Sequence, residues 1–367
     1  MKILYICTFY HGALIFRDAM DALMRRGHEV IAFNAAVKGS IIAPKFEPIM
    51  DDKVIHRECF TKWDRFFFFH KQNKVVKQIY KDVLLSEYQI MHAHTLFSSG
   101  YAAYVIHKKE GIPYIVTIRN TDLNLFMKIP MFNILAEKIV RSAKGVQFLS
   151  RGYQEDFVNK CIAKKYRGLV RSKSCVIGNG LEEFWLKNKV SQFKKWDRKQ
   201  IRMICVGTVN RNKNMLTVLR VVDELTKRKY EVKLTIVGDV IDAEVMHKLQ
   251  QHPKVTVMQF MKKEELVSVY DQSDIYIMPS IHESFGRVYA EAMTRGLPVI
   301  YTKGQGFDGL FKDGEVGYSV NPYDYVKMAD LTLKILADYE NISARCIQNC
   351  ERFDWDTIGE QLEKFYS

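Results

Sequence analysis

The chain has 367 residues, enough for two domains of ordinary size, and its 47% hydrophobic and 26% charged residues are typical of a soluble globular protein. It carries a net charge of +13, and no apolar run reaches the 18 residues that would predict a membrane-spanning helix. The seven cysteines lack the paired spacing of metal ligands, which favours reduced thiols and a cytoplasmic location.

Strand and helix patterns alternate through the first half of the chain. Strands are predicted at Ile3–Phe9, His28–Phe33, Ile90–His92, Pro113–Ile118, Gly145–Leu149 and Ser174–Ile177. Helices are predicted at Leu14–Arg26 (closed by Gly27), Lys74–Leu85, Ser98–Lys109 and Pro130–Ser142. Strands that alternate with helices imply a parallel sheet covered by helices.

A polar and strongly basic segment at 186–200 is typical of a linker, and a second alternation follows it. Strands are predicted at Ile201–Val206, Val232–Val237, Val255–Val257 and Ile275–Met278. Helices are predicted at Asn214–Leu225, Ala243–Gln250, Lys263–Tyr270 and after Gly286. The fold class is therefore α/β, with one domain at 1–185 and another at 201–354.

The most informative segment follows the strand predicted at Ile275–Met278. Two carboxylates, Glu283 and Glu291, stand eight positions apart around a Phe-Gly pair. Glu283 is expected in the loop at the carboxyl end of the strand, and Glu291 about two turns into the next helix. Ser284 is expected to cap that helix, whose free amides and dipole form an anion site. A nucleotide-sugar has hydroxyls that carboxylates can bind and phosphates that hydrogen-bond donors can bind, so this segment suits such a ligand.

This segment resembles the signature of the retaining, nucleotide-sugar-dependent glycosyltransferases of family 4, a Glu, seven residues and a Glu, with Phe-Gly after the first. The resemblance covers nearly the full length and is most specific from Ile201 to Tyr318. It implies the GT-B fold, in which two Rossmann-like domains have parallel sheets facing an inter-domain cleft. It also implies that a C-terminal helix at 355–367 packs back on the first domain.

The resemblance implies transfer of a sugar from a nucleoside-diphosphate-sugar, UDP- or GDP-linked, with retention of configuration. Glu291 would bind both ribose hydroxyls, and Glu283 would hold hydroxyls of the donor sugar. Backbone amides after the Phe-Gly pair, together with Lys213, would neutralise the departing diphosphate. The residues expected to bind nucleotide and diphosphate are Glu291, Lys213, Arg211, Arg287, Phe285, Gly286, Val288 and Gly12.

Two of these positions need comment. The family pattern expects an arginine at Thr208, and either Arg211 or Arg287 could supply the missing charge. Gly12, after the first strand, would let the backbone approach a phosphate, although a plain turn is the alternative. That loop lacks Gly-x-Gly-x-x-Gly, which argues against a dinucleotide-binding dehydrogenase.

In the first half, two loops after strands carry candidate residues. His92 and His94 have the spacing of a metal pair, but no third ligand is near in the sequence. The resemblance instead places His94 against the donor sugar. The loop with Arg119, Asn120 and Asp122 stands where many relatives have His-Gly. It could bind an acceptor or an anionic group, or form an Asx-type turn that caps the next segment.

No side chain stands out as a covalent nucleophile, so catalysis, with Glu283 and His94 as its side chains, would come from positioning and leaving-group stabilisation. Because cationic and backbone groups are expected at the diphosphate and no acidic motif occupies a suitable loop, the enzyme is expected to be metal-independent. No cofactor is expected either. A nucleotide-sugar epimerase or another GT-B enzyme is the nearest alternative. A non-catalytic basic module that binds membrane or nucleic acid is an alternative of another class.

The positive charge lies in the first half of the chain. Residues 1–200 carry 34 lysines and arginines against 18 acidic residues, whereas the remainder carries 21 against 24. This asymmetry suggests that the first half meets something anionic, either nucleic acid or an anionic membrane or lipid-linked acceptor. The slightly acidic second half and the pair of glutamates argue against a non-catalytic basic module, and we expect a lipid-linked acceptor of a surface polysaccharide and no nucleic acid. The enzyme is then expected in the cytoplasm, peripherally on the inner face of the membrane. The run Phe66–Phe69 beside cations is either membrane-facing or core.

Overall fold

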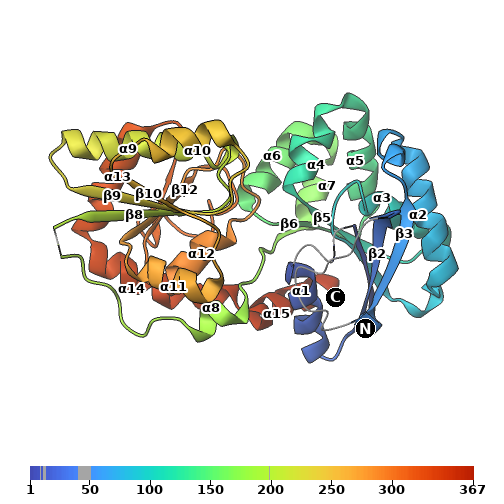
Figure 1. Cartoon of the computed structure of the whole chain (residues 1–367). Helices are drawn as coiled ribbons and strands as arrows, with labels where there is room; N and C mark the ends of the chain where they lie inside the picture. The colour runs from blue at the N-terminus through green and yellow to red at the C-terminus, as the bar shows by residue number, and fades with distance from the viewer. Residues whose placement is uncertain (9, 11–13, 40–50, 198) are drawn as a thin grey trace. The chain divides into compact units, whose positions relative to one another are not determined.

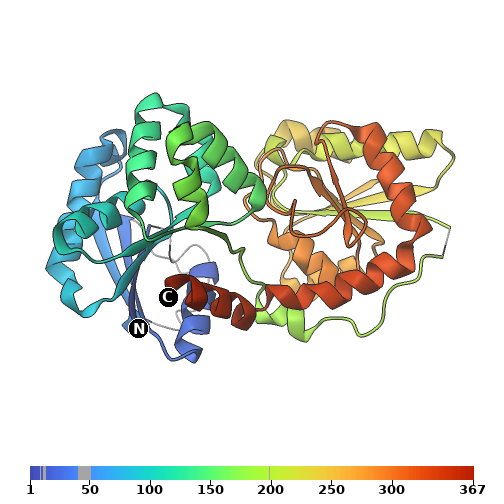
Figure 2. The same ribbon diagram turned by 180° about the vertical axis from the view of Figure 1, so that it is seen from behind.

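The computed structural model describes residues 1–8, 10, 14–39, 51–197 and 199–367, which divide into two compact units. Unit 1 comprises 1–149, 153–180 and 355–367, and unit 2 comprises 150–152 and 181–354. Figures 1 and 2 show the chain from opposite sides.

Unit 1 is built on a parallel sheet whose strand order is β3-β2-β1-β4-β5-β6-β7. The order reverses between β1 and β4, as in a Rossmann fold. The inner strands are short, apolar and buried, as expected for a sheet with helices on both faces. In chain order the strands are β1 (Lys2–Cys7), β2 (Glu29–Val37), β3 (Val54–Phe60), β4 (Ile90–Ala93), β5 (Tyr114–Ile118), β6 (Gly145–Phe148) and β7 (Ser174–Val176).

Each face of this sheet has its own hydrophobic core. One core is formed with α2 (Phe68–Asp82), α3 (Gly100–Glu110), α5 (Pro130–Ser142), α6 (Arg151–Cys161) and α7 (Arg167–Ser172). The other is formed with α1 (Leu14–Arg25) and α15 (Trp355–Tyr366), which lie side by side in Figures 1 and 2. The short helix α4 (Asn120–Asn124) follows β5.

The end of α15 completes a buried polar network under the first sheet. The hydroxyl of Tyr366 lies 3.1 Å from that of Tyr5 and 2.6 Å from Nδ1 of His92. The other ring nitrogen of His92 lies 2.8 Å from Oγ1 of Thr117. Both ring nitrogens of His92 therefore have hydrogen-bond partners, so His92 is not free to bind a metal together with His94.

Unit 2 repeats the same strand order, β10-β9-β8-β11-β12-β13, again with every pairing parallel. Its strands are β8 (Ile201–Val206), β9 (Val232–Val237), β10 (Val255–Met258), β11 (Ile275–Met278), β12 (Val299–Thr302) and β13 (Gly317–Val320). Figure 1 shows α9 (Met215–Lys227), α10 (Ala243–Gln250) and α13 (Tyr325–Ala337) over one face, and α11 (Lys263–Asp271), α12 (Arg287–Thr294) and α14 (Tyr339–Asn349) over the other. The helix α8 (Glu183–Lys187) precedes the sheet.

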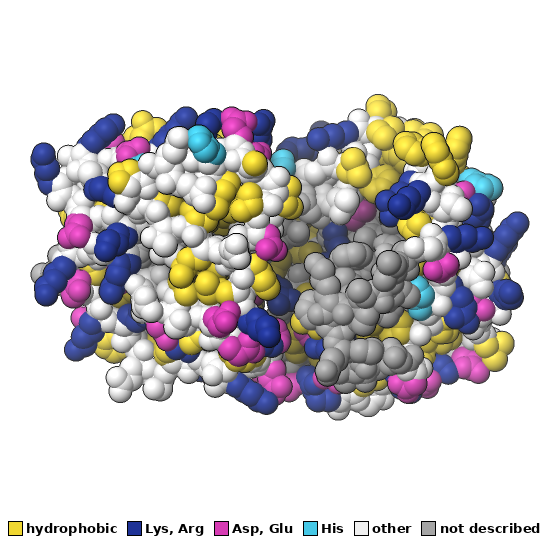
Figure 3. Space-filling view, viewed as in Figure 1, with side chains coloured by type: hydrophobic (Ala, Val, Ile, Leu, Met, Phe, Trp, Pro, Cys, Tyr) yellow, Lys and Arg dark blue, Asp and Glu magenta, His cyan; other side chains and the backbone are white. Residues whose placement is uncertain are grey.

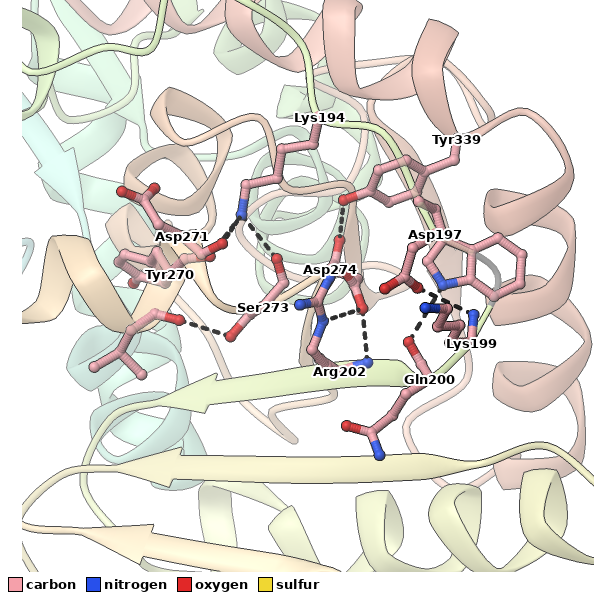
Figure 4. Close-up of polar contacts among 12 residues, drawn as sticks. Lys194, Asp197, Lys199, Gln200, Arg202, Tyr270, Asp271, Ser273, Asp274 and Tyr339 are labelled. Atoms are coloured by element: carbon pink, nitrogen blue, oxygen red, sulfur yellow. Dashed lines mark hydrogen bonds and ion pairs between the residues drawn. The ribbon is translucent and has the colours of Figure 1, made fainter.

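The basic segment 186–200 is attached to unit 2 in its described part. Figure 4 shows the ammonium of Lys194 aimed at the end of α11, where it donates to the carbonyls of Tyr270, Asp271 and Ser273 at 2.8–2.9 Å. Beside it, Asp274 accepts a bidentate pair from the guanidinium of Arg202 at 2.7 and 2.9 Å. Lys194 thus satisfies the carbonyls of Asp271 and Ser273, which have no other partner among the described residues, and shares the carbonyl of Tyr270 with the amide of Ser273.

The predicted fold class is confirmed, since each unit has a Rossmann-like parallel sheet. The helix predicted at Lys74–Leu85 begins earlier, at Phe68, so Phe68 and Phe69 of the phenylalanine run belong to it. The boundary between the units falls at Gly180 and Leu181, which assigns α8 to unit 2.

Candidate functional site

The topology of unit 2 brings two predicted loops together. Strands β8 and β11 are neighbours at the point where the strand order reverses, and ligands of open α/β sheets bind at the carboxyl ends of such strands. The loop after β8 carries Lys213, and the loop after β11 carries Glu283. Nζ of Lys213 lies 2.7 Å from Oε2 of Glu283. The two side chains are only 20% and 15% exposed, so the pair is shielded from solvent.

Three asparagines that the sequence analysis did not assign hold the loop after β8. Asn210 accepts a hydrogen bond from the amide of Lys213 at 3.0 Å and so caps the 3₁₀ turn η7 (Arg211–Lys213). Asn212 donates to the carbonyl of His282 and accepts from its amide, at 2.9 and 3.0 Å. Asn214 has a positive φ of 54° and donates to the carbonyl of Pro279 at 3.1 Å. The three asparagines stand at every second position of one short loop, and this spacing was the sequence feature that could have predicted their role.

The start of α12 differs from the prediction. Its N-cap is Gly286, with a φ of +80°, and not Ser284, whose predicted capping role is wrong. A Cβ at Gly286 would lie 2.4 Å from the ring of Tyr289, so both the conformation and the close contact require glycine. Among the described residues, the backbone amides of residues 284–288 have no hydrogen-bond acceptor. This row of free donors at a helix N-terminus can bind an anion.

The loop after β12 supports the same site. The side chain of Gln305 accepts a hydrogen bond from the amide of Glu283 at 3.0 Å, and the amide of Gly306 donates to the carbonyl of Glu283 at 2.8 Å. A Cβ at Gly306 would lie 2.5 Å from the nitrogen of Phe285, whose buried side chain anchors the loop. Gln305 and Gly306 were not predicted, because their contacts depend on strand order.

Glu291 lies one turn into α12, closer to its start than predicted, and is 8% exposed. Burial raises the pKa of its carboxyl, and the neighbouring Arg287 lowers it less. A guanidinium nitrogen of Arg287 lies 3.9 Å from Glu291, whereas Arg211 faces away and pairs with Asp242 at 3.2 Å and Glu244 at 2.9 Å. Of the two arginines, only Arg287 thus lies beside Glu291. Val288 beside it is half-buried.

In unit 1, His94 follows β4 and is nearly buried against Tyr5 and Phe16, with ring centroids 4.3 and 4.9 Å away. Its Nε2 atom has no hydrogen-bond partner among the described residues, and the ring lines a narrow pocket. Burial holds the pKa of His94 well below its usual range, so the ring is neutral at pH 7. A buried acceptor or donor without a partner is costly and indicates a ligand or water position.

The loop after β5 is held by its own side chains. Oδ2 of Asp122 accepts from the amides of Leu96 and Arg119 at 3.0 and 2.9 Å, and Oδ1 accepts from the amide of Phe97 at 3.3 Å. Asp122 is 1% exposed, and burial raises its pKa to about 6. Its carboxylate thus ties two loops together, which corresponds to the capping alternative.

The other two residues of this loop make different contacts. Nε of Arg119 donates to the carbonyl of His94 at 2.7 Å, and burial lowers the pKa of Arg119 to about 10. Asn120 accepts from the side chain of Asn124. Arg119 therefore connects the loops after β4 and β5, and its guanidinium remains in the pocket of His94.

Gly12 lies outside the described residues. Within the residues that are described, no cluster of three or more His, Cys, Asp or Glu side chains has the arrangement of a metal site. The helices in that part of the chain are too short or too polar to cross a bilayer.

Two family models match consecutive parts of the chain, "Glycosyltransferase Family 4" at residues 15–182 and "Glycosyl transferases group 1" at 187–353. D-inositol 3-phosphate glycosyltransferase of Corynebacterium diphtheriae is 29% identical over 45% of this chain and 42% of its own length, so the chain spans less than half of that relative. The capsular polysaccharide biosynthesis glycosyltransferase CapM of Staphylococcus aureus is 24% identical over 69% of this chain and 70% of its own. The structure of Anabaena Alr3699/HepE in complex with UDP and glucose has a TM-score of 0.69, 18% identity and coverage of 99% and 98%.

Proposed function

Because the chain belongs to the group 1 glycosyl transferases of family 4, we propose that it is an enzyme that transfers a sugar from a nucleoside-diphosphate-sugar to an acceptor hydroxyl, with retention of configuration. One observation carries the proposal most directly. The ion pair of Lys213 and Glu283 lies at the loop that leads into the free amides of α12, and Glu291 follows on the same helix.

The diphosphate would bind at the start of α12. The free amides of residues 284–288 and the helix dipole favour negative charge there. Lys213 is held near this loop by Glu283, and Arg287 is the first residue of the helix. As the bond to the sugar breaks, charge grows on the diphosphate, and these groups would stabilise it in a partly dehydrated site.

The two glutamates would bind hydroxyl groups. Among the described residues, Glu291 has one cation nearby, Arg287 at 3.9 Å, which is beyond hydrogen-bond distance, so its carboxylate can accept from both ribose hydroxyls. Glu283 keeps one oxygen on Lys213 and can accept from the donor sugar with the other. His94 would orient the sugar as a neutral ring. We propose that no covalent nucleophile, metal or cofactor takes part.

The acceptor would be a lipid-linked saccharide or a growing surface polysaccharide, and the enzyme would work in the cytoplasm at the inner face of the membrane. Support comes from the excess of basic residues in the first 200 positions. The name of the CapM relative, a capsular polysaccharide biosynthesis glycosyltransferase, points the same way.

A thermal-shift screen against UDP, GDP, ADP, CMP and dTDP tests the donor site, because a ligand stabilises the state that binds it. We expect one diphosphate to raise the Tm of the wild type and to raise that of Glu291→Ala much less. Glu264→Ala, an exposed glutamate on α11 of the same unit, is the control. An equal shift for Glu291→Ala, or no shift with any nucleotide, would contradict the proposal. Conversion of a donor sugar without an acceptor would indicate an epimerase instead.

A further inference from the structure

Large apolar side chains are exposed where α2 begins in unit 1. Trp63, Phe66, Phe67 and Phe69 are 77%, 78%, 66% and 43% exposed, and they belong to the 3₁₀ turn η3 (Trp63–Phe66) and the start of α2. Phe68 between them packs into the core. The phenylalanine run therefore divides, with one ring in the core and three rings in contact with solvent.

A second exposed apolar segment adjoins the first. Between α4 and the middle of α5, four apolar side chains are 49–64% exposed, namely Leu125, Ile129, Met131 and Ile134. Phe68 links the two segments, since its ring centroid lies 6.1 Å from that of Phe126 and 5.0 Å from that of Phe132. Figure 3 shows hydrophobic side chains gathered over the start of α2, at the upper right. Contiguous apolar patches of this kind mark interaction sites.

The exposed charged side chains of these segments are all positive. Lys62, Arg65 and Lys128 are exposed. The single carboxylate within residues 62–71 and 125–136, that of Asp64, is 6% exposed and accepts from Lys74 at 2.8 Å. We name residues 62–69 and 125–134 the aromatic–basic surface. It exposes aromatic and aliphatic groups beside cations that form no ion pair with another described residue, and it exposes no carboxylate of its own.

We propose that the aromatic–basic surface docks this protein on an anionic lipid bilayer. Aromatic side chains favour the interface between headgroups and acyl chains, and neighbouring lysines and arginines bind anionic headgroups. A second protein chain is the other possible occupant of an apolar face. The uniform positive charge, without a carboxylate to set a binding register, favours a fluid anionic surface over a folded partner.

The position of this surface bears on the proposed acceptor. Leu125 directly follows α4, and α4 begins at Asn120 in the loop at the carboxyl end of β5. Docking would bring that loop to the level of the lipid headgroups, where the sugar of a lipid-linked acceptor lies. This second step rests on the proposed function, whereas the docking itself does not.

Vesicle flotation tests the docking with phosphatidylcholine vesicles that contain or lack phosphatidylglycerol. We expect the full chain to bind the anionic vesicles only, and the double variant Phe66→Ser, Phe67→Ser to bind at least about tenfold more weakly. Lys62→Glu should weaken binding by about fivefold or more. The matched controls are Leu84→Ser, 66% exposed beyond the other end of α2, and Lys108→Glu in the last turn of α3.

Trp63 gives an independent readout, because its ring is 77% exposed and would enter the interface. Its fluorescence should shift to shorter wavelength with anionic vesicles and be quenched by brominated acyl chains. Absence of binding by the wild type, or equal binding by the serine variants and their controls, would overturn the proposal. A dimer in solution that the serine variants abolish would assign the surface to a second copy. The nucleotide-dependent rise in Tm should persist in all variants, which separates this test from that of the donor site.

Discussion

Lys194→Met is expected to destabilise unit 2 and to remove a pH dependence of its stability. The ammonium of Lys194 donates three hydrogen bonds, at 2.8–2.9 Å, to the carbonyls of Tyr270, Asp271 and Ser273 at the end of α11. Methionine fills a similar volume but has no donor, so the carbonyls of Asp271 and Ser273 lose their partner, whereas that of Tyr270 keeps the amide of Ser273. These carbonyls lie directly before β11, the strand that carries the loop of Glu283.

The magnitude follows from two opposing effects. Hydrogen bonds to a charged group contribute about 1.5–3 kcal/mol each, although three that share one ammonium contribute less than three separate ones. Burial lowers the pKa of Lys194 from 10.5 to about 8, which corresponds to a cost of at most about 3 kcal/mol for holding the charge. At pH 7 we therefore expect Lys194→Met to lower the free energy of unfolding by about 1–2 kcal/mol.

The pH dependence has a defined direction. Between pH 8 and about 10.4 the unfolded chain keeps the proton on Lys194 while the folded chain releases it. The unfolded state then binds more protons, so stability from this group rises with pH across that window and is lost again as pH falls through 8. As the pH rises through this window, the difference in unfolding free energy between wild type and Lys194→Met should widen by up to about 3 kcal/mol.

Urea denaturation of both proteins at several pH values from 7 to about 10 measures this difference. Other groups that titrate in the window cancel in the comparison. Lys195→Met, an exposed neighbour in the same segment, is the control and should change neither stability nor its pH dependence. A difference that stays constant or narrows with rising pH would refute the reasoning about burial.

Three further changes test the site. Lys213→Met should weaken the binding of a nucleoside diphosphate, measured by calorimetry, by at least about tenfold, and should change the binding of a nucleoside little. An equal loss of affinity for both ligands would place Lys213 away from the phosphates. Gly286→Ala should cost about 1–3 kcal/mol in thermal unfolding, because alanine would keep a φ of +80° and meet the ring of Tyr289; an unchanged Tm would contradict this geometry. Asp122→Ala leaves three buried amides unpaired and should lower stability by on the order of 3 kcal/mol at pH 7, whereas a neutral effect would exclude its capping role.

The sequence predicted the strands of both sheets well where they are short, apolar and central, as at β8 and β11. It missed β3, an edge strand with exposed Arg57 and Glu58, because one exposed face leaves a weak apolar pattern. It also missed α6, where few side chains are buried. A strand that is buried on both faces has an apolar pattern that the local sequence shows. The pattern of an edge element depends instead on which of its side chains the rest of the fold leaves exposed.

The site was predicted in part. The spacing of Glu283 and Glu291 placed them on one strand–loop–helix unit, and Lys213 followed from the family pattern. The wrong cap at Ser284 shows the limit, because serine is the usual capping residue and the choice of Gly286 depends on the close approach of Tyr289. Gln305 follows another strand, so no residue spacing near Glu283 in the sequence predicts its contact with Glu283.

The contact between Tyr5 and Tyr366 spans almost the entire chain. The residues of α15 are synthesised after all of unit 2, yet they cover one face of the sheet in unit 1. During translation unit 2 can therefore complete its core before unit 1 does, although unit 1 emerges first. Until α15 arrives, β1 and α1 keep an apolar surface open to water, which makes the nascent N-terminal half the part most exposed to chaperones and to aggregation.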